Sequence, residues 1–138
     1  MGCVVIGDDI YAIGGLHDKL ETTSNQSHVQ VYNALTRTWS LAAPLPVGLG
    51  HIQPATCLAG GDILVAGGQE DAPNGVREDV DNPYLYEYDP QTSSWATLAT
   101  LPDPRKSASC GYVDGKIIFY GGNTPTAPYL THSVYVGY

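Results

Sequence analysis

Short apolar runs alternate with polar turns along the whole chain, and one such arrangement recurs three times. In each copy, the second apolar run ends in a glycine doublet, at Gly14-Gly15, Gly67-Gly68 and Gly121-Gly122. The doublets are 67 − 14 = 53 and 121 − 67 = 54 residues apart. A fixed period of this length is typical of a supersecondary unit that buries its surfaces by stacking on copies of itself. The sequence therefore predicts a repeat protein.

Each copy opens with two apolar runs that a tight polar turn separates. In the third copy, residues 110–113 and 117–120 flank Asp114 and Gly115. Two short β-prone runs joined by a Gly/Asp pair predict a β-hairpin, and Asp-Gly is the strongest signal of this kind. Residues 63–66 and 117–120 are apolar without alternation, which predicts strands that are covered on both faces.

A third β-prone run follows each doublet after a long polar loop, at residues 29–32, 85–88 and 133–136. In the first two copies, a turn then leads to Trp39 or Trp95 and to a Leu/Pro stretch. No window shows a sustained helical period. The sequence predicts four short strands per unit, which we call A to D in chain order. Strand D is missing from the third unit, so eleven strands are expected.

This pattern resembles the kelch repeat. The matching residues are the doublet after strand B, a tyrosine that opens the next turn (Tyr32, Tyr88) and the tryptophan seven residues later. The most specific match is the Asp-Pro-x-Thr-x-x-Trp run from Asp89 to Trp95. The resemblance covers nearly the whole chain. It implies an all-β fold of kelch-type β-propeller blades, each a four-stranded antiparallel sheet packed face to face on its neighbours around a channel. Trp39 and Trp95 are expected to pack between adjacent blades.

The predicted organisation is a single domain over residues 1–138 that forms an incomplete ring of about three blades. Blade 1 is expected at 2–46, blade 2 at 53–101 and the incomplete blade 3 at 107–138. Propellers close with about four to eight blades, so two apolar blade faces would stay uncovered. Three explanations stay open: a fragment of a longer propeller, self-association of two copies into a ring of about six blades, or an open array. An intact core in a soluble chain favours self-association.

The three cysteines, Cys3, Cys57 and Cys110, all fall in strand A of their units. An odd number of cysteines placed in strands predicts free, buried thiols in a reducing compartment. No apolar stretch reaches the length of a membrane span, and no signal-peptide pattern opens the chain. The sequence therefore predicts a cytoplasmic protein without a membrane partner.

The distribution of the net charge of −8 points to a binding surface. In a blade of alternating strands, the B–C and D–A loops emerge on one face, which we call the loop face, and the A–B and C–D turns emerge on the other. The B–C loops (16–28, 69–84 and 123–132) are long, and long loops on a rigid β scaffold commonly carry binding function. Seven acids lie in them: Asp18, Glu21, Glu70, Asp71, Glu78, Asp79 and Asp81.

Acidic loops argue against nucleic acid as a partner, because nucleic acid needs clustered Lys and Arg. They favour a basic peptide or another cationic group, and the competing interpretation is a solvated loop that charge keeps soluble. A small cationic patch lies at the entrances to strand A, where His51 aligns with Arg105 and Lys106 follows. By resemblance to kelch proteins, whose D–A loops line the channel mouth, these three residues are expected to contact a carboxylate, a phosphate or a sugar. A plain solvent-facing role is the alternative.

No metal, cofactor or catalytic residue is predicted. Glu78, Asp79 and Asp81 faintly resemble a calcium loop, but Pro83 and the missing glycine and terminal glutamate break the pattern. The four histidines have no ligand-like spacing, and no nucleophile elbow is present.

Two functions from different classes remain. The first is a binding module that recognises a protein or peptide through its long B–C and D–A loops, after self-assembly into a closed propeller. The second is an enzyme on the same fold, because some kelch-like propellers resemble sugar mutarotases or copper oxidases. A mutarotase-like site would use Arg105 with Glu70 or Glu78 as acid/base, whereas no oxidase ligand set can be assembled. Fold alone does not choose between the two, and the sequence favours the binding module.

Overall fold

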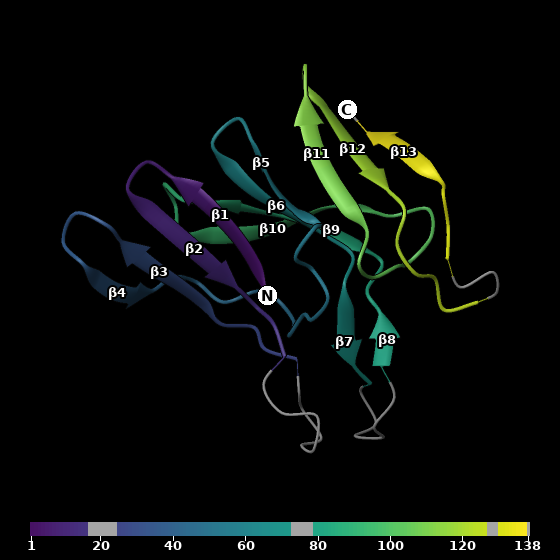
Figure 1. Ribbon diagram of the computed structural model, residues 1–138, viewed down its shortest axis with the longest axis horizontal. Helices are drawn as coiled ribbons and strands as arrows, with labels where there is room; N and C mark the ends of the chain where they lie inside the picture. Colours follow the sequence, from purple (N-terminus) through teal and green to yellow (C-terminus); the bar gives the residue numbers. More distant parts are fainter. Residues whose placement is uncertain (17–24, 73–78, 127–129, 138) are drawn as a thin grey trace.

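The computed structural model describes residues 1–16, 25–72, 79–126 and 130–137, and it shows antiparallel sheets that fan out side by side (Figure 1). The first sheet contains, in spatial order, β1 (Gly2–Ile6), β2 (Asp9–Ile13), β3 (Val29–Asn33) and β4 (Thr38–Leu41). Its strands are strands A to D of the first unit, and each pairs antiparallel with the next.

The second and third sheets repeat this topology. The second contains β5 (Thr56–Ala59), β6 (Asp62–Ala66), β9 (Tyr84–Asp89) and β10 (Ser94–Thr100). The third, as far as the described residues go, contains β11 (Ser109–Val113), β12 (Lys116–Tyr120) and β13 (Val134–Gly137). The predicted all-β fold of kelch-type blades is therefore confirmed. In the described residues, no helix is long and apolar enough to cross a membrane.

Two local signals in the sequence have the expected backbone conformation. Asp114 and Gly115 both have positive φ, at 50° and 74°, as the tight turn between β11 and β12 requires. The doublet Gly67-Gly68 also has positive φ at both residues, at 65° and 104°. It lies against the next D–A loop, because the Gly68 N–H donates to the Arg105 carbonyl at 3.0 Å and a Cβ on Gly67 would collide with that same oxygen.

One predicted loop contains strands that the sequence pattern did not indicate. Within the B–C loop of the second unit, β7 (Gln69–Asp71) and β8 (Asp79–Asp81) form a separate two-stranded hairpin. The prediction of a plain loop over residues 69–84 is therefore wrong at both ends. The segments have three residues each and are polar, so they carry neither the length nor the apolar alternation that marks a strand.

The second blade is the only one in the described chain with both faces covered. Residues 63–66 of β6 are almost completely buried, as predicted. The face of β6 that carries Ile63 and Val65 packs on the first blade, and the other face, with Leu64 and Ala66, packs on the third. The sequence also predicted that residues 117–120 of β12 are covered on both faces. This prediction is wrong, because Tyr120 is 49% exposed and only Phe119 of the strand is buried.

The two tryptophans show what a neighbouring blade contributes. Trp95 packs against the first blade, where its indole N–H donates to the Ala43 carbonyl at 2.9 Å, as expected for a residue between blades. Trp39 occupies the equivalent position in the first blade but is 61% exposed. No described residue covers its face of the sheet, so the prediction of interblade packing is wrong for Trp39 in the single chain.

Both outer faces of the array are apolar and exposed. The strand register places Cys3, Val5, Trp39 and Leu41 on one face of the first blade, which we call the leading face. On the third blade, the outer face is the one that points away from the second blade, and we call it the trailing face. The register places on it Val113, Tyr120, Val134 and Val136. Apart from Cys3, also exposed, each of these side chains is at least 49% exposed. Exposed apolar surface of this kind normally marks an interface.

The cysteines differ from the prediction of free, buried thiols. Cys57 of β5 and Cys110 of β11 form a disulfide with a Cα–Cα distance of 5.9 Å, and Cys3 is a free, exposed thiol. The physical reason lies in the strand register, which turns Cys57 toward the third blade and Cys110 toward the second. Because β5 and β11 are adjacent inner strands, these two side chains meet between the blades.

Candidate functional site

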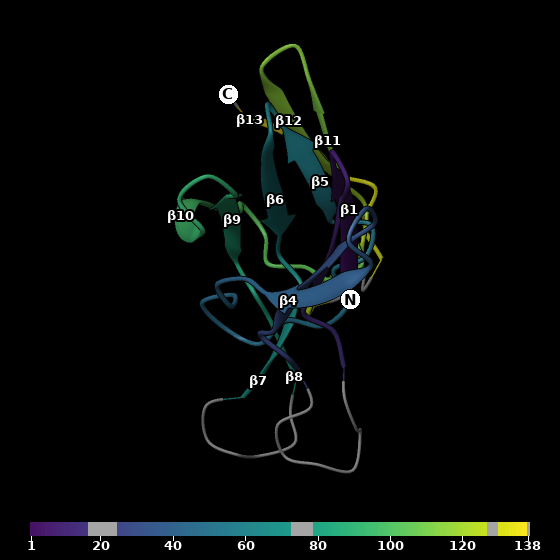
Figure 2. The ribbon, with the colours of Figure 1, turned by 90° about the vertical axis from the view of Figure 1, so that its left-hand side faces the viewer.

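The loop face predicted from the chain topology lies at one end of the molecule. The β7–β8 hairpin projects from this end, and the A–B turns, such as the one between β11 and β12, lie at the opposite end (Figures 1 and 2). The described residues of the B–C and D–A loops meet here. This face therefore contains the candidate site, and hydrogen bonds between blades hold its parts together.

Asp71 joins the B–C loops of the first two blades. Its carboxylate accepts a hydrogen bond of 2.7 Å from Asn25 Nδ2 and two longer ones, at 3.3 and 3.4 Å, from the Asn25 backbone N–H. Asn25 is 7% exposed, so the carboxylate is held by a fixed partner. Gly50 and Gln69 add a backbone bridge beside it, with N···O distances of 2.8 and 2.9 Å. The acidic hairpin is thereby attached to the first blade.

Asp81 joins the acidic hairpin to the third blade. Its carboxylate lies 3.7 Å from Lys106 Nζ, and the side chains are 5% and 28% exposed. The Lys106 backbone also exchanges two hydrogen bonds with Asn123, at 3.0 and 2.8 Å. The structure thus brings a predicted acid and a predicted cation into one ion pair, although the sequence placed them in separate patches.

Glu70 lies beside a buried amide and a buried phenol. Asn82 Nδ2 is 3.5 Å from Glu70 Oε2 and 3.3 Å from the Tyr86 hydroxyl, while Asn82 Oδ1 accepts from the Tyr84 N–H at 2.8 Å. Burial raises the pKa of Tyr86, the Asn82 hydrogen bond opposes this shift, and the Glu70 charge adds to it. The phenol therefore stays protonated at neutral pH.

Arg105 does not point into the loop face as the sequence suggested. Its side chain is fully buried between the second and third blades, where Nη1 donates to the Gly121 carbonyl and Nη2 to the Asp103 carboxylate, both at 3.1 Å. The guanidinium also lies over the Phe119 and Tyr135 rings, 5.6 and 4.9 Å from their centroids, and the Tyr135 hydroxyl donates to the same Asp103 carboxylate. This arrangement corrects the expected contact with a ligand, because the guanidinium is already occupied and inaccessible. The mutarotase-like alternative needed an accessible Arg105, so the burial of this side chain counts against it.

The remaining predicted residues have mixed outcomes. His51 is partly buried, with φ of 54°, and its carbonyl accepts from the Ser107 N–H at 3.0 Å, so two successive D–A loops touch. Asp79 belongs to β8, where it pairs with Asp71. Glu78 lies outside the described residues, as do Asp18 and Glu21.

The sequence did not single out the buried amides Asn25, Gln69 and Asn82, which are at most 7% exposed. The Asn25 side chain holds the Asp71 carboxylate, the Asn82 side chain contacts Glu70 and the Tyr84 backbone, and Gln69 contributes the backbone bridge to Gly50. No motif marks them, because a hydrogen bond between loops far apart in the chain has no local spacing. Gln69 and Asn82 are amides that flank acidic residues, a pattern that is common in ordinary loops, and Asn25 has no acidic neighbour at all.

Comparison with known proteins agrees with the repeat geometry. A family model described as the kelch motif matches residues 1–46. Kelch-like protein terF of Aspergillus terreus is 34% identical over 129 residues, which cover 86% of this chain and 26% of the relative. The chain is a kelch-repeat protein. Kelch repeat and BTB domain-containing protein 12 of Danio rerio is 31% identical over 128 residues, covering 85% of this chain and 19% of the relative.

The kelch blades also match a solved structure. The structure of YjhT superposes with a TM-score of 0.70 over 89% of this chain and 34% of that one, at 19% sequence identity. At this identity the likeness concerns the fold alone. This kelch chain spans about a quarter of the length of the relative from A. terreus and about a third of YjhT.

The buried guanidinium gives a first testable prediction. Replacing Arg105 with Ala removes three side-chain hydrogen bonds and the packing on both rings, so the free energy of unfolding should fall by about 2–4 kcal/mol. Lys116→Ala is the matched control, because Lys116 is an exposed residue at the start of β12 and surface substitutions of this kind change stability by about 0.5 kcal/mol or less. Urea denaturation followed by tryptophan fluorescence measures both variants. Equal denaturation midpoints for Arg105→Ala and the unmodified chain would contradict the structural role.

Proposed function

We propose that this kelch chain is a protein-interaction module whose loop face recognises a basic segment of a partner protein. The observation that carries the proposal is the pair of interblade anchors, Asp71 with Asn25 and Asp81 with Lys106. They fix a hairpin rich in carboxylates at the end of a rigid β scaffold, and positioned charge of one sign selects and steers partners of the other sign. The kelch repeats of one relative occur with a BTB domain, which supports an interaction module.

Glu70 is the residue on which we expect a partner to depend most. Within the described residues, its carboxylate makes a long contact of 3.5 Å to Asn82 Nδ2, whereas the carboxylates of Asp71 and Asp81 make the interblade links. A cationic side chain of the partner could therefore pair with Glu70 without breaking an interblade bond. An Arg-rich segment fits best, because guanidinium groups bind carboxylates in a bidentate manner.

Charge reversal on the loop face tests this proposal. The probe is a fluorescein-labelled hexa-arginine peptide, and its binding is followed by fluorescence anisotropy at low salt. Glu70→Lys should weaken binding by about tenfold, equivalent to about 1.4 kcal/mol. Asp8→Lys is the matched control, because it changes the net charge equally but lies in the exposed A–B turn of the first blade, at the opposite end. Equal weakening by both variants would show attraction to the net charge only, and it would contradict a site on the loop face.

We further propose that two copies of the chain complete a closed ring. The leading face of the first blade and the trailing face of the third are both apolar, and the structure repeats the same face-to-face packing between its own blades. In a head-to-tail pair, the leading face of each copy would pack on the trailing face of the other. The pair would contain about six blades, within the usual range for propellers.

The repeat register gives a sharp test of this ring. Gly111 occupies in the third blade the position of Cys57 in the second, and Cys3 occupies the position of Cys110. In a head-to-tail dimer, a cysteine at position 111 should therefore face Cys3 of the other copy as Cys57 faces Cys110. Gly111→Cys should form a covalent dimer on a non-reducing gel after mild oxidation. The same variant with Cys3→Ser should stay monomeric, and a Gly111→Cys chain that does not cross-link would count against the ring.

A further inference from the structure

The two sides of the β7–β8 hairpin have different surroundings. The strand register pairs Gln69 with Asp81 and Glu70 with Val80, so the two pairs lie on opposite sides of the hairpin. On the first side, Asp81 forms the ion pair with Lys106, and the Gln69 backbone bridges the preceding D–A loop. On the second side, Val80 is 40% exposed. Within the described chain, the first side makes the interblade contacts and the second is available to a partner.

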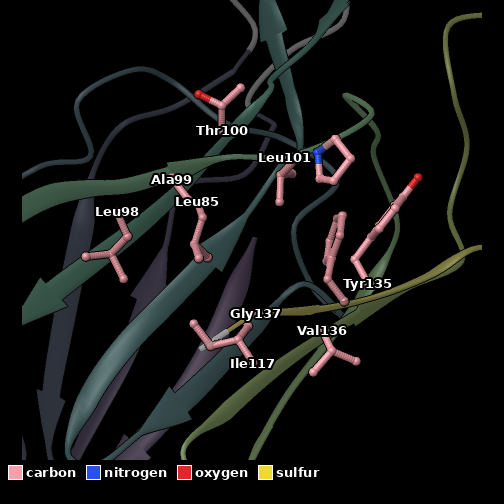
Figure 3. A pocket seen from close by; sticks show the side chains of 11 residues that line it. Leu85, Leu98, Ala99, Thr100, Leu101, Ile117, Tyr135, Val136 and Gly137 are labelled. Carbon is pink, nitrogen blue, oxygen red and sulfur yellow. The ribbon is translucent and has the colours of Figure 1, made fainter.

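The start of β9 adds an exposed aromatic ring next to the hairpin. Figure 3 shows Leu85 of β9 pointing into an apolar groove between the second and third blades. Its neighbours Tyr84 and Tyr86 therefore point to the opposite face of the sheet, where Tyr86 packs with the first blade. The two tyrosine rings have centroids 6.0 Å apart. Tyr86 is 3% exposed and Tyr84 is 40% exposed, so Tyr84 presents part of its ring to solvent at the loop end of the strand.

Asn82 connects the Glu70 carboxylate to this pair of rings. Its Nδ2 lies 3.5 Å from Glu70 Oε2 and 3.3 Å from the Tyr86 hydroxyl, and its Oδ1 accepts from the Tyr84 N–H at 2.8 Å. The Asn82 side chain is completely buried. One fixed amide therefore holds a carboxylate and the backbone of an exposed tyrosine in place.

These groups match the three parts of an arginine side chain. A guanidinium binds a carboxylate through two N–H groups, stacks its planar face on an aromatic ring, and lays its methylene stem along apolar surface. Glu70, Tyr84 and Val80 supply the carboxylate, the ring and the apolar surface. A lysine ammonium is a compact charge that neither stacks nor binds in a bidentate manner. The groove of Figure 3 offers a cation no counter-charge, because no Asp or Glu is among the described residues that line it.

We propose that Glu70, Val80 and Tyr84 form a site for one arginine of the partner's basic segment, and that Tyr84 determines a preference for arginine over lysine. This inference rests on the proposed function, because it requires that a basic segment binds the loop face. The guanidinium pairs with the Glu70 carboxylate and lies on the exposed part of the Tyr84 ring, while its stem contacts Val80. The interblade links of Asp71 and Asp81 stay intact when the site is filled.

The test compares fluorescein-labelled hexa-arginine with hexa-lysine, which carries the same formal charge, by fluorescence anisotropy at low salt. The unmodified chain should bind the arginine peptide severalfold more tightly. Tyr84→Leu keeps an apolar side chain but removes the ring, so it should weaken binding of hexa-arginine by about threefold, the size expected for an exposed cation–π contact. Binding of hexa-lysine should change less, so the preference for arginine should shrink. Tyr84→Phe keeps the ring and should retain the preference.

Tyr112→Leu is the matched control. Tyr112 is 42% exposed, close to the value for Tyr84, but it lies in β11 beside the A–B turn, at the end opposite the loop face. Its replacement should leave the binding of both peptides unchanged. A second measurement needs no variant that could fail to fold: in NMR spectra of the chain with labelled tyrosine rings, hexa-arginine should shift the Tyr84 ring signals and leave those of Tyr112 in place.

The outcomes separate this inference from the proposed function. If Glu70→Lys weakens binding of hexa-arginine but Tyr84→Leu leaves the preference for arginine unchanged, the loop face still binds the basic segment and the tyrosine site is wrong. An equal loss of both peptides with Tyr84→Leu, or an unshifted Tyr84 ring, would overturn the tyrosine site in the same way. If Glu70→Lys has no effect on either peptide, the proposed function fails and the tyrosine site fails with it.

Discussion

Each blade of this protein has two apolar faces, and its hydrophobic core is complete only where a neighbouring blade covers them. The second blade shows the complete case, with residues 63–66 buried on both sides. The first and third blades each have one covered face, and their outer faces expose Trp39 and Val134 to 61% and 60%. The proposed assembly would therefore also stabilise the chain, since it would bury the apolar faces that the single chain leaves exposed.

The contacts between blades also build the candidate binding surface. Asp71, Asp81 and Arg105 each connect one blade to another, either directly or through a D–A loop. Two of these residues hold the acidic hairpin at the loop face, and the third fixes the spacing of the second and third blades from inside. A change in blade packing would therefore move the carboxylates of the proposed binding surface.

Local chemistry made much of the fold predictable from the sequence. The glycine doublets and the Asp114-Gly115 turn require backbone conformations that few residues adopt, so they mark hairpin ends wherever they occur. The position of Arg105 was not predictable in the same way. An arginine in a D–A loop has the same local sequence whether it faces solvent or turns inward. Besides the nearby Asp103, its partners are Gly121, Phe119 and Tyr135, which lie at least 14 residues away in the sequence. The Cys57–Cys110 disulfide likewise depends on the register of two separate hairpins.

The central claim is that the two open blade faces cover each other in a closed assembly. Light scattering coupled to size-exclusion chromatography, over a range of protein concentrations, tests it most directly because it measures absolute mass. The account predicts a species of twice the chain mass of 14.7 kDa that persists on dilution. A soluble species of single-chain mass at every concentration would contradict it, because the apolar leading and trailing faces would then be stable in water without a partner.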